Sequence, residues 1–375
     1  MPSAPHEPIP MLDLAGEVET LWDELQPAIE RVLRSGQFVG GPEVAAFEAE
    51  AAEDLEAGHA VGLNSGTDAL VIALEALGIG AGDEVITTPF SFFATSEAIL
   101  RRGATPVFGD IDPETLNLDP DTIPPLLSDR TRAILPVHLF GLPADMNRIT
   151  EIAEAHDLAV VEDAAQAFGA RCTAADGAKA GTLGTLGAFS FYPTKTLGAY
   201  GDAGLLTTQD DELAQTIRRL RTHGSRPNAK YVHDMLGHNS RLDALQAAIL
   251  RVKLPRVALA SAARRRVAGW YHELLSDTDG VDLPPLHDDH VFHQFTVQLP
   301  EERLEKVRGA LDEAGIAHQR FYPVPLSSQP VMGTPQARPV ADAASARVLS
   351  LPVHPGLTPE QVGRVAEVVR GVVQG

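Results

Sequence analysis

The sequence contains a single cysteine, Cys172, among its 375 residues. One cysteine can form neither an intrachain disulfide nor a cysteine metal cluster, so we expect a reducing compartment, by default the cytoplasm. Uninterrupted apolar runs stay below the roughly 18 residues of a membrane-spanning helix, which excludes such a helix. The first ten residues show neither the basic start nor the apolar stretch of a secretory signal.

Basic residues are scarce as well. Lysine and arginine number 30 against 51 aspartates and glutamates, which gives a formal net charge of -21. The resulting field repels nucleic acid and anionic lipid, so neither is expected as a partner. Apolar residues make up 44% and charged residues 22%, which is typical of a folded globular protein. The chain length predicts two or three domains.

Short apolar runs alternate with helix-like segments through the first half of the chain. The runs are 60–63, 84–88, 105–108, 133–139, 158–161, 188–192 and 203–207, and the helical patterns are 17–34, 68–77, 91–102, 146–156 and 211–221. Strands that are apolar throughout are buried on both faces. This alternation predicts an α/β fold with a mostly parallel sheet and helices on each side. Pro27 predicts a kink or restart in its helix.

The pattern changes near residue 255. Ser240 followed by Asp243 predicts a capping box that opens a helix, and Pro255 closes that helix. Beyond it lie a strand-like segment, 293–299, and a helix-like segment, 301–314. We therefore expect residues 1–255 to form a large α/β domain with an N-terminal helical segment, and residues 256–375 a small C-terminal α+β domain.

Ligands of open α/β sheets bind beyond the carboxyl ends of the strands, so polar residues that follow apolar runs are candidates. The turn 62–67, Gly-Leu-Asn-Ser-Gly-Thr, offers free amides that suit a phosphate, although Ser65 or Thr67 could simply cap a helix. Asp163 follows Glu162 at the end of an apolar run. It could bind a metal, hold a ribose hydroxyl, pair with a protonated ring nitrogen or cap the next segment.

Two further segments stand out. Lys195 follows an aromatic strand and precedes a glycine-rich turn, where desolvation would lower its pKa and make the amine a nucleophile, unless it is an ordinary surface lysine. Residues 237–241 follow a stretch of basic residues with no acid between them: Arg218, Arg219, Arg221, Arg226 and Lys230. These charges fit a solvated helix face, an anionic substrate or a neighbouring subunit.

A phosphate-binding turn, an acid, a lysine and a nearby hydroxyl are together what pyridoxal 5'-phosphate requires. The lysine forms an imine with the cofactor aldehyde, and the acid keeps the pyridine nitrogen protonated. An opposite charge at close range shifts a pKa by about 1 to 3 units, or roughly 1.4 to 4 kcal/mol, which is enough to fix the protonation state. The lysine, once displaced by a substrate amine, can move the substrate proton.

The sequence resembles the DegT/DnrJ family of nucleotide-sugar aminotransferases, which share the aspartate aminotransferase-like architecture, fold type I. The segments that carry the resemblance are 35–44, 65–70, 110–113, 136–141, 162–167, 189–195, 239–243 and 322–326. They extend over nearly the whole chain. The resemblance implies a pyridoxal 5'-phosphate-dependent transferase with a large, mostly parallel sheet domain and a smaller C-terminal α+β domain.

The resemblance also implies roles for individual residues. Lys195 would bind the cofactor covalently, and Asp163 would pair with its ring nitrogen. The other cofactor contacts would be Ser65, Gly66, Thr67 and Ser190 at the phosphate, Gln166 at the ring hydroxyl and Phe92 stacked on the ring. Asn239 would reach the cofactor phosphate of a second subunit, which implies a homodimer with shared sites. Arg241 and Tyr322 are expected to bind substrate. By themselves, Phe92, Gln166 and Ser190 are also consistent with a core aromatic, a helix start and a strand hydroxyl.

Family members with histidine in place of the lysine dehydrate sugars, so Lys195 favours transamination. We expect transfer of an amino group from L-glutamate to a keto-sugar nucleotide at the sugar 3-position, of the UDP-2-acetamido-3-oxo-glucuronate or dTDP-3-oxo-6-deoxyhexose type, for surface polysaccharide biosynthesis. Phe321 stands where the uronate enzymes have histidine, so the sugar contacts are expected to differ. The alternatives are a 4-keto-sugar aminotransferase, a non-catalytic regulatory protein of the same fold and, remotely, a metal hydrolase using His233 and His238. No metal is expected.

Overall fold

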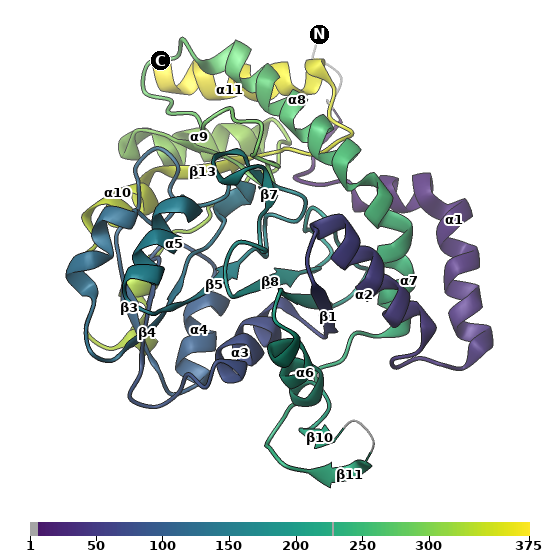
Figure 1. Ribbon diagram of the computed structural model, residues 1–375. Helices are drawn as coiled ribbons and strands as arrows, with labels where there is room; N and C mark the ends of the chain where they lie inside the picture. The colour runs from purple at the N-terminus through teal and green to yellow at the C-terminus, as the bar shows by residue number, and fades with distance from the viewer. Residues whose placement is uncertain (1–6, 227–228) are drawn as a thin grey trace.

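The computed structural model describes residues 7–226 and 229–375, and a seven-stranded sheet forms its centre (Figure 1). In spatial order the strands are β1 (His59–Leu63), β9 (Gly204–Thr208), β8 (Leu186–Ser190), β5 (Ala159–Asp163), β4 (Thr131–Leu135), β2 (Glu84–Thr87) and β3 (Thr105–Phe108). Only β9 within this sheet runs antiparallel to its neighbours. The predicted α/β fold with a mostly parallel sheet is confirmed.

Both faces of this sheet are buried, because successive residues of a strand point to opposite sides. On β9, Leu205 packs beneath α2 (Pro42–Leu55) and α7 (Ala244–Lys253), whereas Leu206 packs beneath α3 (Gly66–Ala76), α4 (Ala94–Arg101) and α6 (Asp211–Leu220). α5 (Met146–Ala155) covers Ile134 of β4. Each fully buried leucine or isoleucine contributes about 1.5 to 3 kcal/mol, which fixes the helical layers on the sheet.

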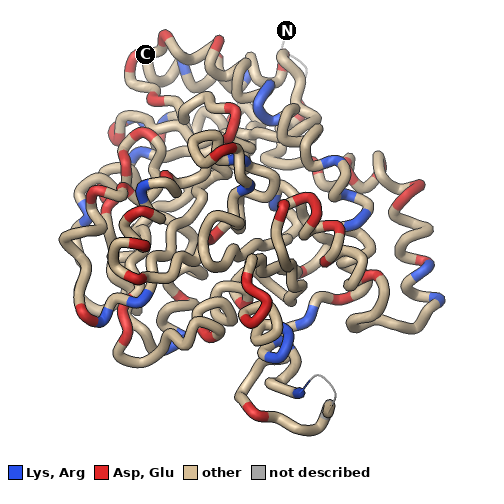
Figure 2. Tube along the Cα trace, viewed as in Figure 1, with Lys and Arg blue, Asp and Glu red and all other residues tan. Residues whose placement is uncertain are grey.

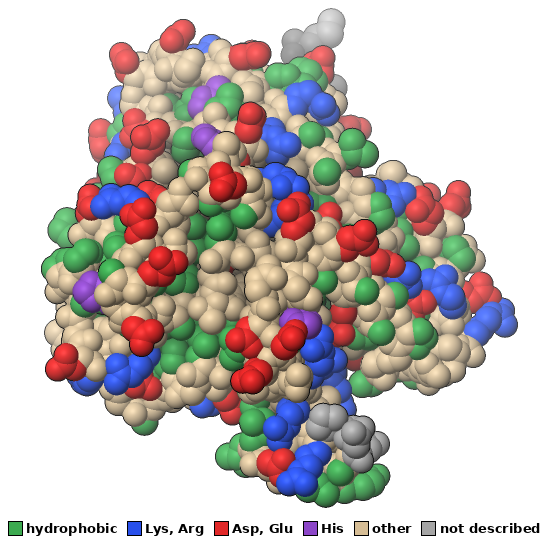
Figure 3. All heavy atoms as spheres, in the orientation of Figure 1, with side chains coloured by type: hydrophobic (Ala, Val, Ile, Leu, Met, Phe, Trp, Pro, Cys, Tyr) green, Lys and Arg blue, Asp and Glu red, His purple; other side chains and the backbone are tan. Residues whose placement is uncertain are grey.

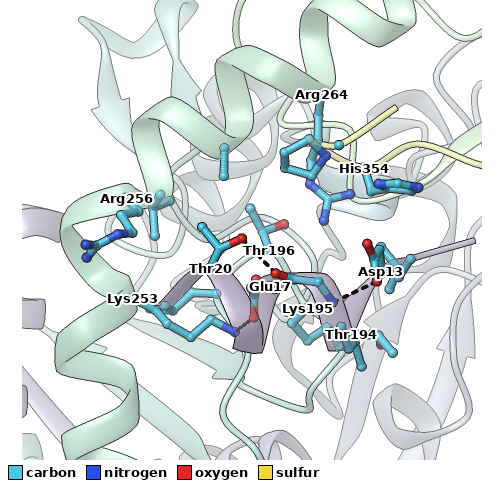
Figure 4. A pocket seen from close by; sticks show the side chains of 18 of the residues that line it. Asp13, Glu17, Thr20, Thr194, Lys195, Thr196, Lys253, Arg256, Arg264 and His354 are labelled. Atoms are coloured by element: carbon cyan, nitrogen blue, oxygen red, sulfur yellow. Dashed lines mark hydrogen bonds and ion pairs between the residues drawn. The ribbon is translucent and has the colours of Figure 1, made fainter. Parts of the chain in front are cut away.

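α1 (Leu14–Ser35) packs against α7 at one side of the molecule (Figure 1). It continues through Pro27 as one helix, so of the expected kink or restart at this proline the restart is wrong and the kink stays a prediction. The side chain of Asp13 caps the helix by accepting a hydrogen bond from the Gly16 amide at 2.8 Å. The start of α1 lies next to the segment 193–197, which contains Lys195 (Figure 4).

The remaining C-terminal elements build a second hydrophobic core. They are α8 (Val257–Leu275), β12 (Phe295–Gln298), α9 (Glu301–Glu313), α10 (Pro339–Arg347), β13 (Val348–Leu351) and α11 (Pro359–Gln374). The buried residues of this core come from Val267 onward, with Ile9 as the one contribution from the N-terminal segment. We therefore propose the division near residue 255, with the segment around Ile9 lying against the smaller domain.

Short elements complete the fold. They are the paired strands β6 (Arg171–Cys172) and β7 (Ala178–Lys179), the hairpin β10 (Ser225–Arg226) and β11 (Ala229–His233), and the short 3-10 helices Pro120–Thr122, Pro124–Leu126, Leu139–Gly141, Thr173–Ala175, Leu254–Arg256, Leu326–Ser328 and Pro330–Met332. None of the helices in the described ranges is long and apolar enough to cross a membrane.

The hairpin β10–β11 projects from the body of the molecule below α6 (Figure 1). Hydrophobic and basic side chains lie on it (Figure 3), beside Asp234, which pairs with Arg226, and acidic residues are also spread along the rest of the chain (Figure 2). Tyr231 and Leu236 are 86% and 89% exposed. Part of the basic stretch noted in the sequence thus lies on a projecting arm, although the side chain of Lys230 falls outside the described residues.

Helix α7 begins differently from the prediction. Asp243 is its N-cap residue but makes no side-chain capping bond, and the Ser240 hydroxyl donates instead to Asn64 Oδ1 at 2.9 Å. The predicted capping box is therefore wrong, because a contact distant in sequence takes the hydroxyl that would have capped the helix. This contact fastens the 239–243 segment beside the turn that follows β1. The helix ends at Lys253, before Pro255, as expected.

The close approach of chain segments in the sheet predicts how two glycine positions respond to alanine. A Cβ at Gly187 in β8 would lie 2.0 Å from the Gly181 carbonyl oxygen, whereas a Cβ at Gly363 in α11 would meet nothing within 4 Å. We expect Gly187→Ala to lower the free energy of unfolding by about 1 to 3 kcal/mol. Gly363→Ala should raise it by about 0.5 to 1 kcal/mol. Thermal unfolding of both variants tests this, and an unchanged melting temperature for Gly187→Ala would contradict the described strand packing.

Candidate active site

The candidate residues meet at one edge of the central sheet. Ser65 follows β1, Asp163 is the last residue of β5, Ser190 is the last residue of β8, and Lys195 lies in the segment between β8 and β9. β5 and β8 are parallel neighbours, so their carboxyl ends meet at the same edge. Topology thus brings together residues that are more than a hundred positions apart.

Asp163 is 5% exposed, and two protein donors hold its carboxylate. The Thr95 hydroxyl donates to Oδ2 at 2.8 Å, and the Ala165 amide donates to Oδ1 at 3.2 Å. Burial raises the pKa of Asp163, while these two hydrogen bonds and the nearby Lys195 and His138 lower it. A buried carboxylate of this kind gains from an adjacent cation.

Lys195 has the complementary property. Burial lowers the pKa of its amine to about 8, against the opposing influence of Asp163. At pH 7, about one such amine in ten is neutral, compared with fewer than about one in a thousand for an ordinary lysine. The structure therefore favours the interpretation of Lys195 as a desolvated nucleophile over that of a surface lysine.

The sequence left open whether the turn after β1 caps a helix or binds a phosphate, and the structure of the turn is compatible with both. Ser65 caps α3 by accepting a hydrogen bond from the Asp68 amide at 3.1 Å. The first turn of any helix leaves amides without intrahelical partners, which here include those of Gly66 and Thr67. A Cβ at Gly66 would lie 2.6 Å from the Ser190 Cβ. Gly66 therefore lets this helix terminus approach Ser190.

Glu162, the residue before Asp163, has a structural role. Its fully buried carboxylate accepts hydrogen bonds from the amides of Gly181, Leu183 and Gly184 at 2.6 to 2.7 Å, and it contacts His138 Nε2 at 2.8 Å. His138 Nδ1 accepts from the Ala144 amide, so Nε2 carries the proton and donates to Glu162. These contacts satisfy the buried acid and hold the loop between β7 and β8.

Gln166 connects the sheet edge to the smaller domain. Its Oε1 accepts from the Phe140 amide at 2.6 Å, and its Nε2 donates to the Tyr322 hydroxyl at 3.0 Å. The ring of Tyr322 stacks on Phe140 at 6.4 Å and meets Phe90 edge-on at 6.0 Å. Tyr322 therefore lies next to Gln166, and the two expected binding residues are brought together.

Two further candidates, Phe92 and Asn239, are exposed. Phe92 is 60% exposed. Asn239 accepts a hydrogen bond from Arg241 through Oδ1 and pairs through its backbone with Thr222. Because Ser240 contacts Asn64, this segment lies beside the turn after β1 of its own chain. The role of Asn239 towards a second subunit remains a prediction.

The two histidines of the hydrolase alternative have separate surroundings. His233 Nδ1 lies 2.8 Å from the His223 carbonyl oxygen, and His238 Nε2 lies 2.7 Å from a carboxylate oxygen of Glu75. In the part of the chain that the structure describes, no group of three or more histidine, cysteine, aspartate or glutamate side chains could hold a metal ion. These contacts give no support to a metal hydrolase.

Several contributors were not identified from the sequence. Thr95 holds Asp163, and its hydroxyl lies 3.0 Å from that of Ser91. The spacing of these two residues on one helical turn was the only available signal, and it is common among helical residues of any function. A cavity of about 600 Å³ also opens beside Lys195, between the start of α1, α8 and His354 (Figure 4).

Comparison with known proteins identifies relatives with a similar sequence and fold. The chain is 46% identical over 367 residues to a pleiotropic regulatory protein of Geobacillus stearothermophilus, covering 96% of this chain and 97% of that protein. It is 47% identical over 372 residues to a UDP-N-acetyl-3-dehydro-alpha-D-glucosamine 3-aminotransferase of Acidithiobacillus ferrooxidans, covering 98% of each. The solved structure of S. venezuelae DesV in complex with a ketimine intermediate superposes with a TM-score of 0.94 at 43% identity, covering 99% of this chain and 100% of DesV. The fold inferred from the resemblance is confirmed.

The family model of the DegT/DnrJ/EryC1/StrS aminotransferases matches residues 20–370. This range includes the turn after β1, Asp163, Lys195, Asn239 and Tyr322. The chain belongs to the DegT/DnrJ/EryC1/StrS aminotransferase family.

Proposed function

We propose that the protein is a pyridoxal 5'-phosphate-dependent aminotransferase that moves an amino group from L-glutamate to a keto-sugar nucleotide, at the sugar 3-position. The observation that carries this proposal is the pairing of a buried acid, Asp163, with a desolvated lysine, Lys195, at the carboxyl ends of adjacent strands. The family and the structural match to an aminotransferase support it.

The residues present fit this cofactor. Asp163 needs a cationic partner, and a protonated pyridine nitrogen is one. Glycine at position 66 lets the start of α3 lie against Ser190, where any Cβ would clash, and a helix terminus in this position suits a phosphate group. The side-chain amide of Gln166 is held by the Phe140 backbone amide, at the edge of the sheet where Asp163 lies. We propose Ser65, Gly66, Thr67 and Ser190 as the phosphate contacts, with Gln166 at the ring hydroxyl.

When bound, the cofactor supplies an electron sink for the bond that loses a proton. The chain's own residues set the conditions for that step. Thr95 and Ala165 hold the Asp163 carboxylate in a fixed position, so it would pair with the ring nitrogen without having to reorganise. Lys195, with its pKa lowered to about 8, can accept a proton near neutral pH and return it to a neighbouring carbon.

The acceptor sugar follows from the relatives. The Acidithiobacillus ferrooxidans relative is named for the 3-position of a UDP sugar, so we propose a 3-keto-sugar nucleotide, with UDP as the nucleotide. Arg241 and Tyr322 are the proposed substrate-binding residues. Tyr322 is already fixed by Gln166 and two aromatic rings, so its hydroxyl has a defined position at the site.

We propose a cytoplasmic homodimer in which Asn239 of one subunit reaches the cofactor phosphate of the other. The exposure of Phe92 at the site is consistent with a face completed by cofactor and a second subunit. The projecting hairpin and the exposed Leu236 that follows β11 give a further apolar surface for such contact. The single buried cysteine fits a reducing compartment.

A second candidate function rests on one observation. The Geobacillus stearothermophilus relative is named a regulatory protein, which would suit a chain that binds the cofactor without turnover. Asp163, Lys195, Gln166 and Ser190 all have the residue types that catalysis requires. We therefore favour the enzyme.

The first experiment tests Lys195. We expect the purified protein to show a visible absorption band from bound cofactor and to convert it to the amino form when L-glutamate is added. Lys195→Ala should lose both the band and all measurable turnover, because the other lysine that lines this cavity, Lys253, is held by Glu17. Lys306→Ala, which removes an exposed lysine amine on α9, serves as the folding and cofactor-loading control. A wild-type band that L-glutamate leaves unchanged would favour the regulatory alternative, and a band retained by Lys195→Ala would exclude the assignment of Lys195.

The second experiment tests the sugar. With L-glutamate as donor, UDP and dTDP sugars carrying a 3-keto or a 4-keto group are compared by kcat/KM. We expect the UDP-2-acetamido-3-keto sugar to exceed its 4-keto isomer by at least about tenfold, or about 1.4 kcal/mol of transition-state discrimination. Equal or reversed preference between the two keto positions would contradict the proposed 3-position.

A further inference from the structure

The cavity beside Lys195 contains polar atoms that no described residue satisfies. It has a volume of about 600 Å³ and is lined by the start of α1, by the segment 193–197, by one side of α8 and by residues 354–356. Three of its lining side chains have a buried polar atom without a hydrogen-bond partner in the described ranges: Thr196 Oγ1, Arg264 Nε and His354 Nε2. Buried polar atoms normally find partners, so their convergence here points to a ligand.

Arg264 is the central group of this cluster. It reaches from α8 toward the cavity, and His354 approaches from the chain after β13 (Figure 4). Arg264 is only 5% exposed, and its Nη1 donates to the carbonyl oxygens of Val353 and Phe292. These two bonds fix the plane of the guanidinium while its Nε edge remains free. A buried guanidinium held in this way is a preorganised donor for a carboxylate.

Two of the other basic side chains of the cavity are already paired, whereas Asp13 keeps its negative charge. Lys253 lies 2.5 Å from Glu17, and Arg256 pairs with Glu24. Asp13 is engaged in capping α1. The positive charge that remains for a ligand therefore comes from Arg264, with Lys195 at the inner wall. This is enough for one carboxylate, whereas a diphosphate would carry more negative charge toward Asp13 and Glu17 than the lining can offset.

We propose that this cavity is the subsite for a carboxylate of the amino donor, with Arg264, His354 and Thr196 as its binding residues. The proposal rests on the proposed function, since it places the donor next to Lys195. An amino acid whose carboxylate meets the Nε edge of Arg264 lies in the same cavity that Lys195 lines, so its amine can approach the lysine. His354 Nε2 and Thr196 Oγ1 supply further hydrogen bonds to the carboxylate oxygens.

Binding is measured directly with glutarate, which has the two carboxylates of L-glutamate but no amine and cannot react. Isothermal titration of the cofactor-loaded enzyme with glutarate should give saturable binding, and the neutral analogue glutaramide should bind at least tenfold more weakly. Arg264→Met should weaken glutarate binding at least tenfold, and Arg264→Lys should weaken it less. Thr196→Val removes only the hydroxyl and should weaken binding severalfold.

Arg266→Met is the matched control. Arg266 lies on the same helix two residues away, outside the cavity lining and against Trp270, so its variant should bind glutarate as the wild type does. Should Arg264→Met lower the melting temperature so far that its binding cannot be measured, the glutarate affinities of Thr196→Val and Arg264→Lys test the subsite. Both substitutions replace a side chain by one of similar size. UDP is titrated in parallel, and its binding should be insensitive to Arg264.

The outcomes distinguish failure of the proposed subsite from failure of the proposed function. Glutarate binding that depends on Arg264 and Thr196 supports the subsite. Glutarate binding unaffected by every one of these variants, no glutarate binding, or UDP binding that requires Arg264 overturns it, even where the Lys195-dependent visible band is intact and the proposed function stands. Loss of that band in the wild-type protein would instead refute the proposed function.

Discussion

A buried carboxylate without a full counter-charge is the constraint on which the site depends. Asp163 lies at the end of a strand with 5% of its surface exposed, and Lys195, whose charge acts on it, is itself desolvated. Neither group can satisfy the other fully, because burial raises the pKa of the acid and lowers that of the amine. Each is therefore poised for a third partner. A cofactor with a cationic ring nitrogen and an aldehyde meets both needs.

The rest of the fold holds these two groups in place. Glu162 fastens the loop that leads into β8 through three backbone amides, and Thr95 fixes the Asp163 carboxylate from the helix across the site. Gln166 ties the sheet edge to Tyr322 of the smaller domain. The helix α8 continues this connection, because Arg264 on it reaches the cavity beside Lys195. The electrostatics of the site thus follow from packing that involves both domains.

Much of this was predictable from the sequence, for physical reasons. The strands are buried on both faces, so they appear as apolar runs, and their carboxyl ends pointed to Asp163, Lys195 and the turn at Gly66. Contacts between distant segments were not predictable. Thr95 contacts Asp163 across 68 positions, and Ser240 contacts Asn64 across 176, in place of the capping box that its local spacing indicated. The free Nε edge of Arg264 likewise depends on carbonyl groups of two distant segments.

The protonation of the ring nitrogen proposed for Asp163 is measured most directly by nitrogen NMR of the enzyme loaded with cofactor labelled at that nitrogen. The account predicts a protonated ring nitrogen at neutral pH in the wild-type enzyme and a largely unprotonated one in Asp163→Asn, with the label still bound. An unprotonated nitrogen in the wild type, or the same protonated signal in both proteins, would contradict it.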